Sequence, residues 1–298
     1  MNMLIVVLTM LCFPPASYAA EITKLTHVAS VYTDQSGGGI KQPEGIACAA
    51  QSRFIVSDTG NGRLLSFILQ DQAVQPVTEI KVPGMTYPLN VRANSRQELY
   101  VLDGKQHRIF VINADGTLKG YLDPAGAPPP ALISPRSLAV GPDDQLFLLD
   151  IFGERVLVLG PQGVYIRQIA FPAGYGFISD IAVDGKGTIF LIDSVRSLVL
   201  ANAKDVNAFT PFTESLKEYV DFPEAITVSG RGKLLITDRN GGSLVVIGPD
   251  GSFLERLLRM GRTEGLLNYP AQTCINDRGE LFIADRSNSR LQIFVASP

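Results

Sequence analysis

Residues 43–63 read PEGIACAAQSRFIVSDTGNGR, and this stretch sets the pattern for the whole chain. Its apolar runs, Ile46–Ala47 and Phe54–Val56, are short and are bounded by Gly, Asp and Asn, which is typical of β-strands. The turn from Asp58 to Arg63 leads into a third apolar run, Leu64–Leu69. We therefore expect consecutive antiparallel strands joined by short turns.

The same pattern occurs six times along the chain. Each unit runs fifteen residues from its opening Pro (once Ile) to an Asp, and the Asp residues recur at spacings of 45, 47, 43, 45 and 47. A tight turn and a fourth, weaker strand follow. Six such four-stranded antiparallel units predict an all-β, six-bladed β-propeller. The units begin with Pro43–Asp58, Pro88–Asp103, Pro135–Asp150, Ile178–Asp193, Pro223–Asp238 and Pro270–Asp285.

The last repeat lacks a strand, and the amino-terminal part of the chain has one to spare. The last unit reaches Pro298 after only three predicted strands, whereas Lys24–Thr33 precedes the first unit as an unassigned strand. We predict that this amino-terminal strand completes the sixth blade and closes the ring, which removes exposed strand edges. Residues 21–298 then form a single domain.

The residues Pro43–Ala47 followed by Ile55–Arg63 resemble a repeat of the NHL family. The unit from Pro270 to Phe294 is the next clearest match, and the unit at Ile178 departs most, because Leu198 stands where the pattern has Arg. The resemblance implies a six-bladed propeller. It implies no particular activity, since the family's functions are diverse.

Residues 1–20 have the pattern of a secretory signal peptide. The apolar run Leu4–Phe13 is too short to span a membrane and is followed by Ser17-Tyr18-Ala19, where small residues suit cleavage after Ala19 or Ala20. We expect a periplasmic or extracellular protein with no membrane span after signal removal. The 26 Lys and Arg against 29 Asp and Glu give a net charge of −3, without the basic excess that nucleic-acid binding requires.

Two cysteines, Cys48 and Cys274, lie on predicted first strands of the first and sixth units. These units become neighbours when the ring closes, so a disulfide is one alternative. The cysteines lie five and four residues after their Pro, however, and this difference predicts side chains on opposite faces of their strands. The sequence therefore favours two buried thiols.

In four units the Asp is followed five residues later by Arg. Repetition favours a structural role, in which each Asp accepts backbone N–H bonds in its turn and the Arg clamps the hairpin or the next blade. A binding or catalytic site needs one copy of a residue, so we expect function where the repeat breaks. The pairs are Asp58 and Arg63, Asp103 and Arg108, Asp150 and Arg155, and Asp285 and Arg290.

Strand order places these turns and the long connections at one end of the propeller, here called the loop-rich face. Binding groups concentrate on such loops. Our main hypothesis is that this face binds an envelope or extracellular protein or peptide, without catalysis and without a cofactor. The candidate binding residues are Tyr87, Asn90, Arg136, Tyr175, Phe177, Asp180, Tyr219, Phe222, Tyr269 and Gln272.

The alternative is a calcium-dependent lactonase or hydrolase. Glu44, Asn90, Asp180 and Glu224 follow the opening residues of their units and could direct oxygen ligands for Ca²⁺ into a central channel, an arrangement similar to that of six-bladed lactonases. Arg136 in the same set would repel a cation. A zinc lyase is excluded, because it needs three His ligands and the chain has two His.

Overall fold

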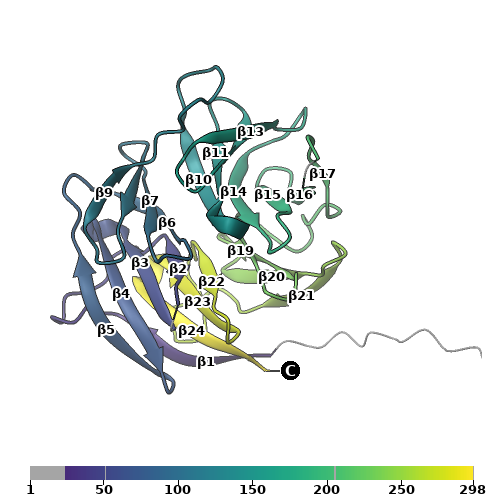
Figure 1. The fold of residues 1–298 in the computed structure, drawn as a ribbon. Helices are drawn as coiled ribbons and strands as arrows, with labels where there is room; N and C mark the ends of the chain where they lie inside the picture. The colour runs from purple at the N-terminus through teal and green to yellow at the C-terminus, as the bar shows by residue number, and fades with distance from the viewer. Residues whose placement is uncertain (1–23, 51, 205, 298) are drawn as a thin grey trace, which may run out of the picture.

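The computed structural model describes residues 24–50, 52–204 and 206–297. Within these ranges the chain forms six four-stranded antiparallel sheets, which are arranged as the blades of a propeller (Figure 1). The predicted six-bladed, all-β fold is confirmed. The predicted signal peptide, residues 1–20, lies outside the described residues. No described helix is long and apolar enough to cross a membrane.

Each blade takes its strands from consecutive sequence, except the sixth. The first blade is β2 (Ile46–Cys48), β3 (Arg53–Asp58), β4 (Arg63–Gln70) and β5 (Ala73–Ile80); the second is β6 (Pro88–Ala93), β7 (Leu99–Asp103), β8 (Arg108–Ile112) and β9 (Leu118–Tyr121). The third is β10 (Pro135–Val140), β11 (Leu146–Asp150), β12 (Arg155–Leu159) and β13 (Tyr165–Ala170); the fourth is β14 (Ile178–Val183), β15 (Ile189–Asp193), β16 (Leu198–Asn202) and β17 (Thr210–Pro211). The fifth is β18 (Pro223–Val228), β19 (Leu234–Asp238), β20 (Ser243–Ile247) and β21 (Phe253–Leu257); the sixth is β22 (Thr273–Ile275), β23 (Glu280–Asp285), β24 (Arg290–Ser297) and β1 (Lys24–Val31).

The sixth blade contains both ends of the described chain. Its outer strand, β1, pairs antiparallel with β24, from Lys24 opposite Ser297 to Val31 opposite Leu291. The pairing is irregular only between His27 and Ala29, and the His27 ring meets Phe294 edge-on at a centroid distance of 5.4 Å. The amino-terminal segment therefore supplies the strand that the last repeat lacks.

The hydrophobic core consists of six clusters, one between each pair of neighbouring blades. Side chains alternate between the two faces of a strand, so every blade contributes to two clusters. In β3, for example, Phe54 and Val56 pack against the sixth blade, whereas Ile55 packs towards the second. The middle strands are therefore mostly apolar, because both of their faces are buried.

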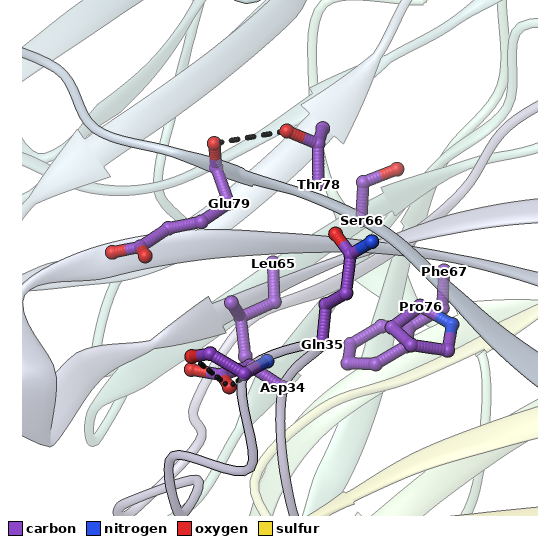
Figure 2. A pocket seen from close by; sticks show the side chains of 9 residues that line it. Asp34, Gln35, Leu65, Ser66, Phe67, Pro76, Thr78 and Glu79 are labelled. Atoms are coloured by element: carbon purple, nitrogen blue, oxygen red, sulfur yellow. Dashed lines mark hydrogen bonds between the residues drawn. The ribbon is translucent and has the colours of Figure 1, made fainter.

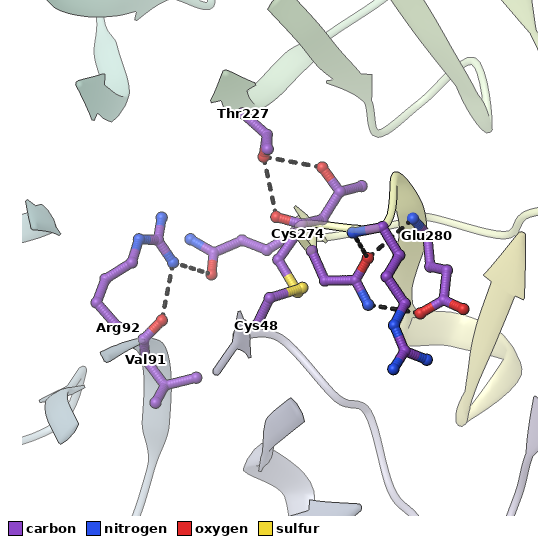
Figure 3. The surroundings of a disulfide bond; sticks show 10 residues. Cys48, Val91, Arg92, Thr227, Cys274 and Glu280 are labelled. Atoms are coloured by element: carbon purple, nitrogen blue, oxygen red, sulfur yellow. Dashed lines mark hydrogen bonds between the residues drawn. A yellow bond between two sulfur atoms is a disulfide. The ribbon is translucent and has the colours of Figure 1, made fainter. Parts of the chain in front are cut away.

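Cys48 and Cys274 form a disulfide between β2 and β22, with their Cα atoms 5.7 Å apart (Figure 3). The expectation of two free thiols was wrong, and ring geometry gives the reason. Neighbouring blades meet through opposite faces, so side chains that point to opposite faces of equivalent strands point towards each other across the boundary. The difference in offset that favoured free thiols is the arrangement that an interblade bond needs.

The repeated Asp is buried in all six blades and joins the second strand to the segment that opens the blade. Its carboxylate accepts a backbone N–H from a residue 16 or 17 positions earlier. Burial alone would raise the pKa of Asp103, but backbone N–H donors from Thr86, Tyr87, Gln106 and Lys105 hold that pKa below its usual range. The Asp residues and their donors are Asp58 and Lys41, Asp103 and Thr86, Asp150 and Ser134, Asp193 and Gly176, Asp238 and Asp221, and Asp285 and Asn268.

Arg63, Arg155 and Arg290 form ion pairs with the Asp five residues earlier, at 2.7, 3.0 and 2.7 Å respectively. The structure corrects the predicted pairing of Asp103 with Arg108. The exposed Arg108 guanidinium instead lies 4.4 Å from the centroid of the Tyr121 ring. The backbone donors already satisfy Asp103, so the second blade does not depend on an Arg at this position.

Arg155 and Arg108 occupy the same repeat position in different surroundings, which allows a matched comparison. Arg155 is 3 % exposed and also donates to the carbonyls of Pro128, Pro129 and Pro130. Replacement Arg155→Ala leaves the buried Asp150 without its ion-pair partner, so we expect a loss of about 3–5 kcal/mol in the free energy of unfolding. The control Arg108→Ala should lose less than about 1 kcal/mol, since it removes only an exposed cation–π contact. Equal losses in urea denaturation would contradict the proposed clamp.

The disulfide closes a loop of 226 residues between the first and sixth blades. Loop-closure entropy and measured cases predict that the double change Cys48→Ser and Cys274→Ser lowers the free energy of unfolding by about 2–5 kcal/mol. Thermal melting with and without reductant checks this. Reductant should lower the melting temperature of the wild type to that of the double variant and leave the double variant unchanged, whereas a reductant-insensitive wild type would show that the bond stabilises nothing.

Candidate binding site at the mouth of the channel

The first strands of the blades lie side by side around the centre of the propeller (Figure 1). By strand order they begin at the loop-rich face. The positions that directly follow the opening Pro therefore lie around the mouth of the central channel. The turn after each repeated Asp lies at the same end. Residues that differ between blades at these two positions meet there, although they are far apart in sequence.

Five charged side chains form a network that we name the mouth cluster: Glu44, Arg136, Glu224, Arg239 and Arg286. Oε1 of Glu224 accepts a hydrogen bond from Nη2 of Arg136 at 3.2 Å and forms an ion pair with Nη1 of Arg239, also at 3.2 Å. Arg286 donates from Nε to Glu44 and thereby joins the sixth blade to the first. The Arg136 guanidinium also lies 5.4 Å from the centroid of the Phe177 ring.

Two of these arginines stand where other blades carry a structural hydroxyl. Thr59, directly after Asp58, donates to the carbonyl of Pro88, and Ser194, directly after Asp193, donates to that of Pro223. These bonds join each blade to the next. In the fifth and sixth blades the equivalent residues are Arg239 and Arg286, and their side chains form ion pairs at the channel mouth instead.

Burial affects the charge balance of the mouth cluster. The side chain of Glu44 is only 13 % exposed. Burial raises the pKa of Glu44 above its usual range, although Arg286 and Arg239 favour its ionised form. Removing a carboxylate from water disfavours its charge, and the two guanidinium groups oppose that effect.

A second set of polar residues, the channel layer, lies further along the first strands: Asn90, Arg92, Ser137, Asp180 and Gln272. Asp180 accepts the Ser137 hydroxyl and, at 3.0 Å, the backbone N–H of Ile226. Its Oδ1 lies 3.9 Å from Nη2 of Arg92, and Arg92 donates to Gln272 at 3.1 Å. Asn90 donates to Ser137 at 2.9 Å. Figure 3 shows Arg92 extending from β6 towards the strand that carries Cys274.

The four predicted calcium ligands are divided between these two sets. Glu44 and Glu224 belong to the mouth cluster, and Asn90 and Asp180 belong to the channel layer. Every carboxylate among them has a guanidinium neighbour. Among the described residues, no group of three or more His, Cys, Asp or Glu side chains lies close enough to hold a metal ion. This donor set does not fit Ca²⁺, which needs several converging oxygens free of competing cations.

The predicted aromatic residues have different surroundings. Phe177 lies beside Arg136, and Lys105 Nζ lies 5.1 Å from the ring centroid of Tyr87. Tyr175 packs edge-on against Phe171, and Tyr219 stacks on Phe253. The last two contacts involve the outer part of the blades and not the channel. Phe222 is partly buried and donates its backbone N–H to Asp238, whereas Tyr269 is 42 % exposed.

Sequence reasoning missed Arg92, Ser137, Arg239 and Arg286. A signal for two of them was present, since Arg follows the repeated Asp only in the fifth and sixth blades. Arg92 lies two residues after Asn90 on the same strand and so shares its face. Ser137 was not distinguished from other small polar residues.

The cavity in Figure 2, of about 220 Å³, lies away from the mouth, between the outer strands of the first blade and residues 34–36. Its acidic groups are already paired, because Arg63 Nη1 lies 2.7 Å from Asp34 and 3.3 Å from Glu79. Leu65, Phe67 and Pro76 supply apolar walls. We regard this cavity as part of the rim of the first blade.

Comparison with known structures agrees with this architecture. A gluconolactonase from Xanthomonas campestris is 18% identical, with 93% of this chain and 91% of that chain covered and a TM-score of 0.68. Virginiamycin B lyase from Staphylococcus aureus is 11% identical, with 92% and 99% covered and a TM-score of 0.65. A protein of unknown function from Bacteroides thetaiotaomicron is 15% identical, with 92% and 76% covered and a TM-score of 0.69. At such identities the likeness shows the fold alone.

No curated protein matches the chain. Residues 267–294 match the family model of the NHL repeat. This range includes β22, β23 and the beginning of β24, which are the strands that the sixth repeat contributes to its own blade. Together with the six four-stranded blades, the match supports the resemblance seen in the sequence: the chain contains an NHL repeat within a six-bladed β-propeller fold.

Proposed function

We propose that this protein is a noncatalytic scaffold that binds another polypeptide on its loop-rich face. The distribution of exposed apolar side chains is the observation that carries the proposal. Among the described residues, twelve large hydrophobic side chains are exposed. Seven of them belong to the turns and connections of this face, and an eighth, Tyr121, ends the strand that leads to it. The eight are Tyr32, Tyr121, Leu132, Ile151, Phe152, Val195, Met260 and Tyr269.

The types and positions of these residues support a polypeptide partner. Tyr, Phe and Met are enriched in protein interfaces, as is Arg, which is concentrated at the mouth. The most exposed of the eight are Leu132, Val195 and Phe152, at 62, 59 and 55 %. All three belong to connections or turns of the third and fourth blades. Phe177, from the same sector, lies beside Arg136 at the channel mouth.

The predicted signal peptide makes an envelope or extracellular polypeptide the expected partner. The calcium-dependent lactonase is the competing proposal. The gluconolactonase and lyase similarities contribute only a shared fold to it. It would also require Glu44, Asp180 and Glu224 to leave their arginine neighbours and turn towards a metal, which would break the ion pairs of partly buried guanidinium groups.

A calcium titration separates the two proposals. Because each carboxylate of the mouth is already ion-paired, we expect the melting temperature to be the same in millimolar calcium and in chelator. Glu224→Ala should respond in the same way as the wild type. Stabilisation by calcium that disappears in Glu224→Ala would instead favour the lactonase.

Binding to the loop-rich face can be tested with apolar residues from both ends of the propeller. Photo-crosslinkers at Phe152 and, as a control, at Val164 in the β12–β13 turn should identify a partner from envelope extracts at the first position only. With that purified partner, Phe152→Ser combined with Val195→Ser should weaken binding by roughly tenfold or more, because burial of each side chain contributes about 1.5–3 kcal/mol.

The matched control is Val164→Ser combined with Val206→Ser, which removes side chains of similar exposure, 56 and 46 %, from the opposite end. This control should bind as tightly as the wild type. Weaker binding by the control pair, with full affinity in the Phe152 and Val195 pair, would place the interface on the wrong face and reject the proposal.

A further inference from the structure

The mouth cluster contains one more guanidinium group than carboxylate. Arg136, Arg239 and Arg286 face only two acidic side chains, Glu44 and Glu224. The arginine side chains are also the more exposed, at 31, 24 and 21 % against 13 and 16 % for the glutamates. The surface that the cluster presents to the opening is therefore cationic.

Two of these arginines are held beside one another. Arg136 and Arg239 contact the same oxygen of Glu224, so a single carboxylate keeps both guanidinium groups together. Each guanidinium has five N–H donors, and one ion pair leaves most of them available. Within the described part of the chain, Nε of Arg136 is buried and has no hydrogen-bond partner. A buried donor without an acceptor is unfavourable, and a ligand oxygen would satisfy it.

The size of the charge excess indicates which anion would fit. One singly charged group would bring three carboxylates against three guanidinium groups, whereas a phosphate would add more negative charge than the excess. The planar fork of Arg matches a carboxylate through two parallel hydrogen bonds.

We propose that the mouth cluster binds a carboxylate group of the partner polypeptide, between Arg136 and Arg239. This inference rests on the proposed function, since the apolar residues of the loop-rich face would hold the rest of the same polypeptide. The carboxylate comes from either a chain end or an Asp or Glu side chain. Both sources have the chemistry that the guanidinium pair recognises.

The probe is a display library of random heptapeptides with free carboxyl termini, selected on the purified full-length protein. Peptides that bind the wild type should share a carboxylate at one position. Amidation of the terminus, or Asn or Gln in place of the acidic residue, distinguishes the two sources and should weaken binding to the wild type by roughly tenfold or more.

Arg239→Gln should reduce that carboxylate preference to less than about twofold while it retains binding through the apolar contacts. Glu224 keeps its ion pair with Arg136 in this variant, so the fold is preserved. Arg136→Lys provides a second variant, which keeps the charge but loses the forked donor geometry and should show an intermediate preference. The control Arg96→Gln, at an exposed ion pair with Glu98 in the β6–β7 turn, should behave as the wild type.

Peptides that bind the loop-rich face without a shared carboxylate, or whose preference survives Arg239→Gln, would overturn this inference and leave the scaffold proposal in place. If the double change Phe152→Ser and Val195→Ser weakens the binding of no selected peptide, both proposals fail.

Discussion

Closure of the ring between the sixth and first blades is the constraint on which the rest of the structure depends. Two contacts cross this boundary, because Cys48 is bonded to Cys274 and Arg286 forms an ion pair with Glu44. The pairing of β1 with β24 completes the sixth blade itself. A buried cluster that includes Phe54 and Phe282 packs between the same two blades. The first and last repeats could not contribute to one channel mouth without these contacts, because only the boundary brings them together.

The repeat separates residues that build the fold from residues available for binding. Six buried Asp side chains satisfy backbone donors in equivalent turns, and this need is the same in every blade. The mouth cluster and the channel layer are instead composed of residues that occur once or twice. Thr59 and Ser194 donate hydrogen bonds that join neighbouring blades. At the equivalent position of the fifth and sixth blades, Arg239 and Arg286 form ion pairs at the channel mouth instead. A rigid ring thus holds a small set of charges in fixed positions.

The sequence was sufficient to predict the blades, their number and the extra strand at the amino terminus. These features follow from local strand and turn chemistry repeated at a constant interval, from Pro43 to Asp285. Contacts between blades were less predictable. The prediction of free thiols compared the strand faces of Cys48 and Cys274 as though both strands belonged to one sheet. Asp103 was paired with Arg108 by analogy with the other units.

The composition of the mouth was also only partly accessible from sequence. Glu44, Arg136 and Glu224 were identified by their place after the opening Pro. Their partners Arg239 and Arg286 follow the repeated Asp, and the repeat pattern alone does not show that side chains from these two positions reach each other. The distance across the channel depends on how the six blades assemble. An oxygen-lined calcium site and an arginine-rich anion site were therefore not distinguishable before the three-dimensional structure was known.

Native-state hydrogen exchange measures ring closure most directly. If β1 completes the sixth blade, its amides from Leu25 to Ser30 should exchange through the same opening event as those of β24, with similar free energies of protection. Amides in β1 that exchange orders of magnitude faster than those of β24 would show that the amino-terminal strand is not an integral part of the blade. The sixth blade would then lack the outer strand that completes it.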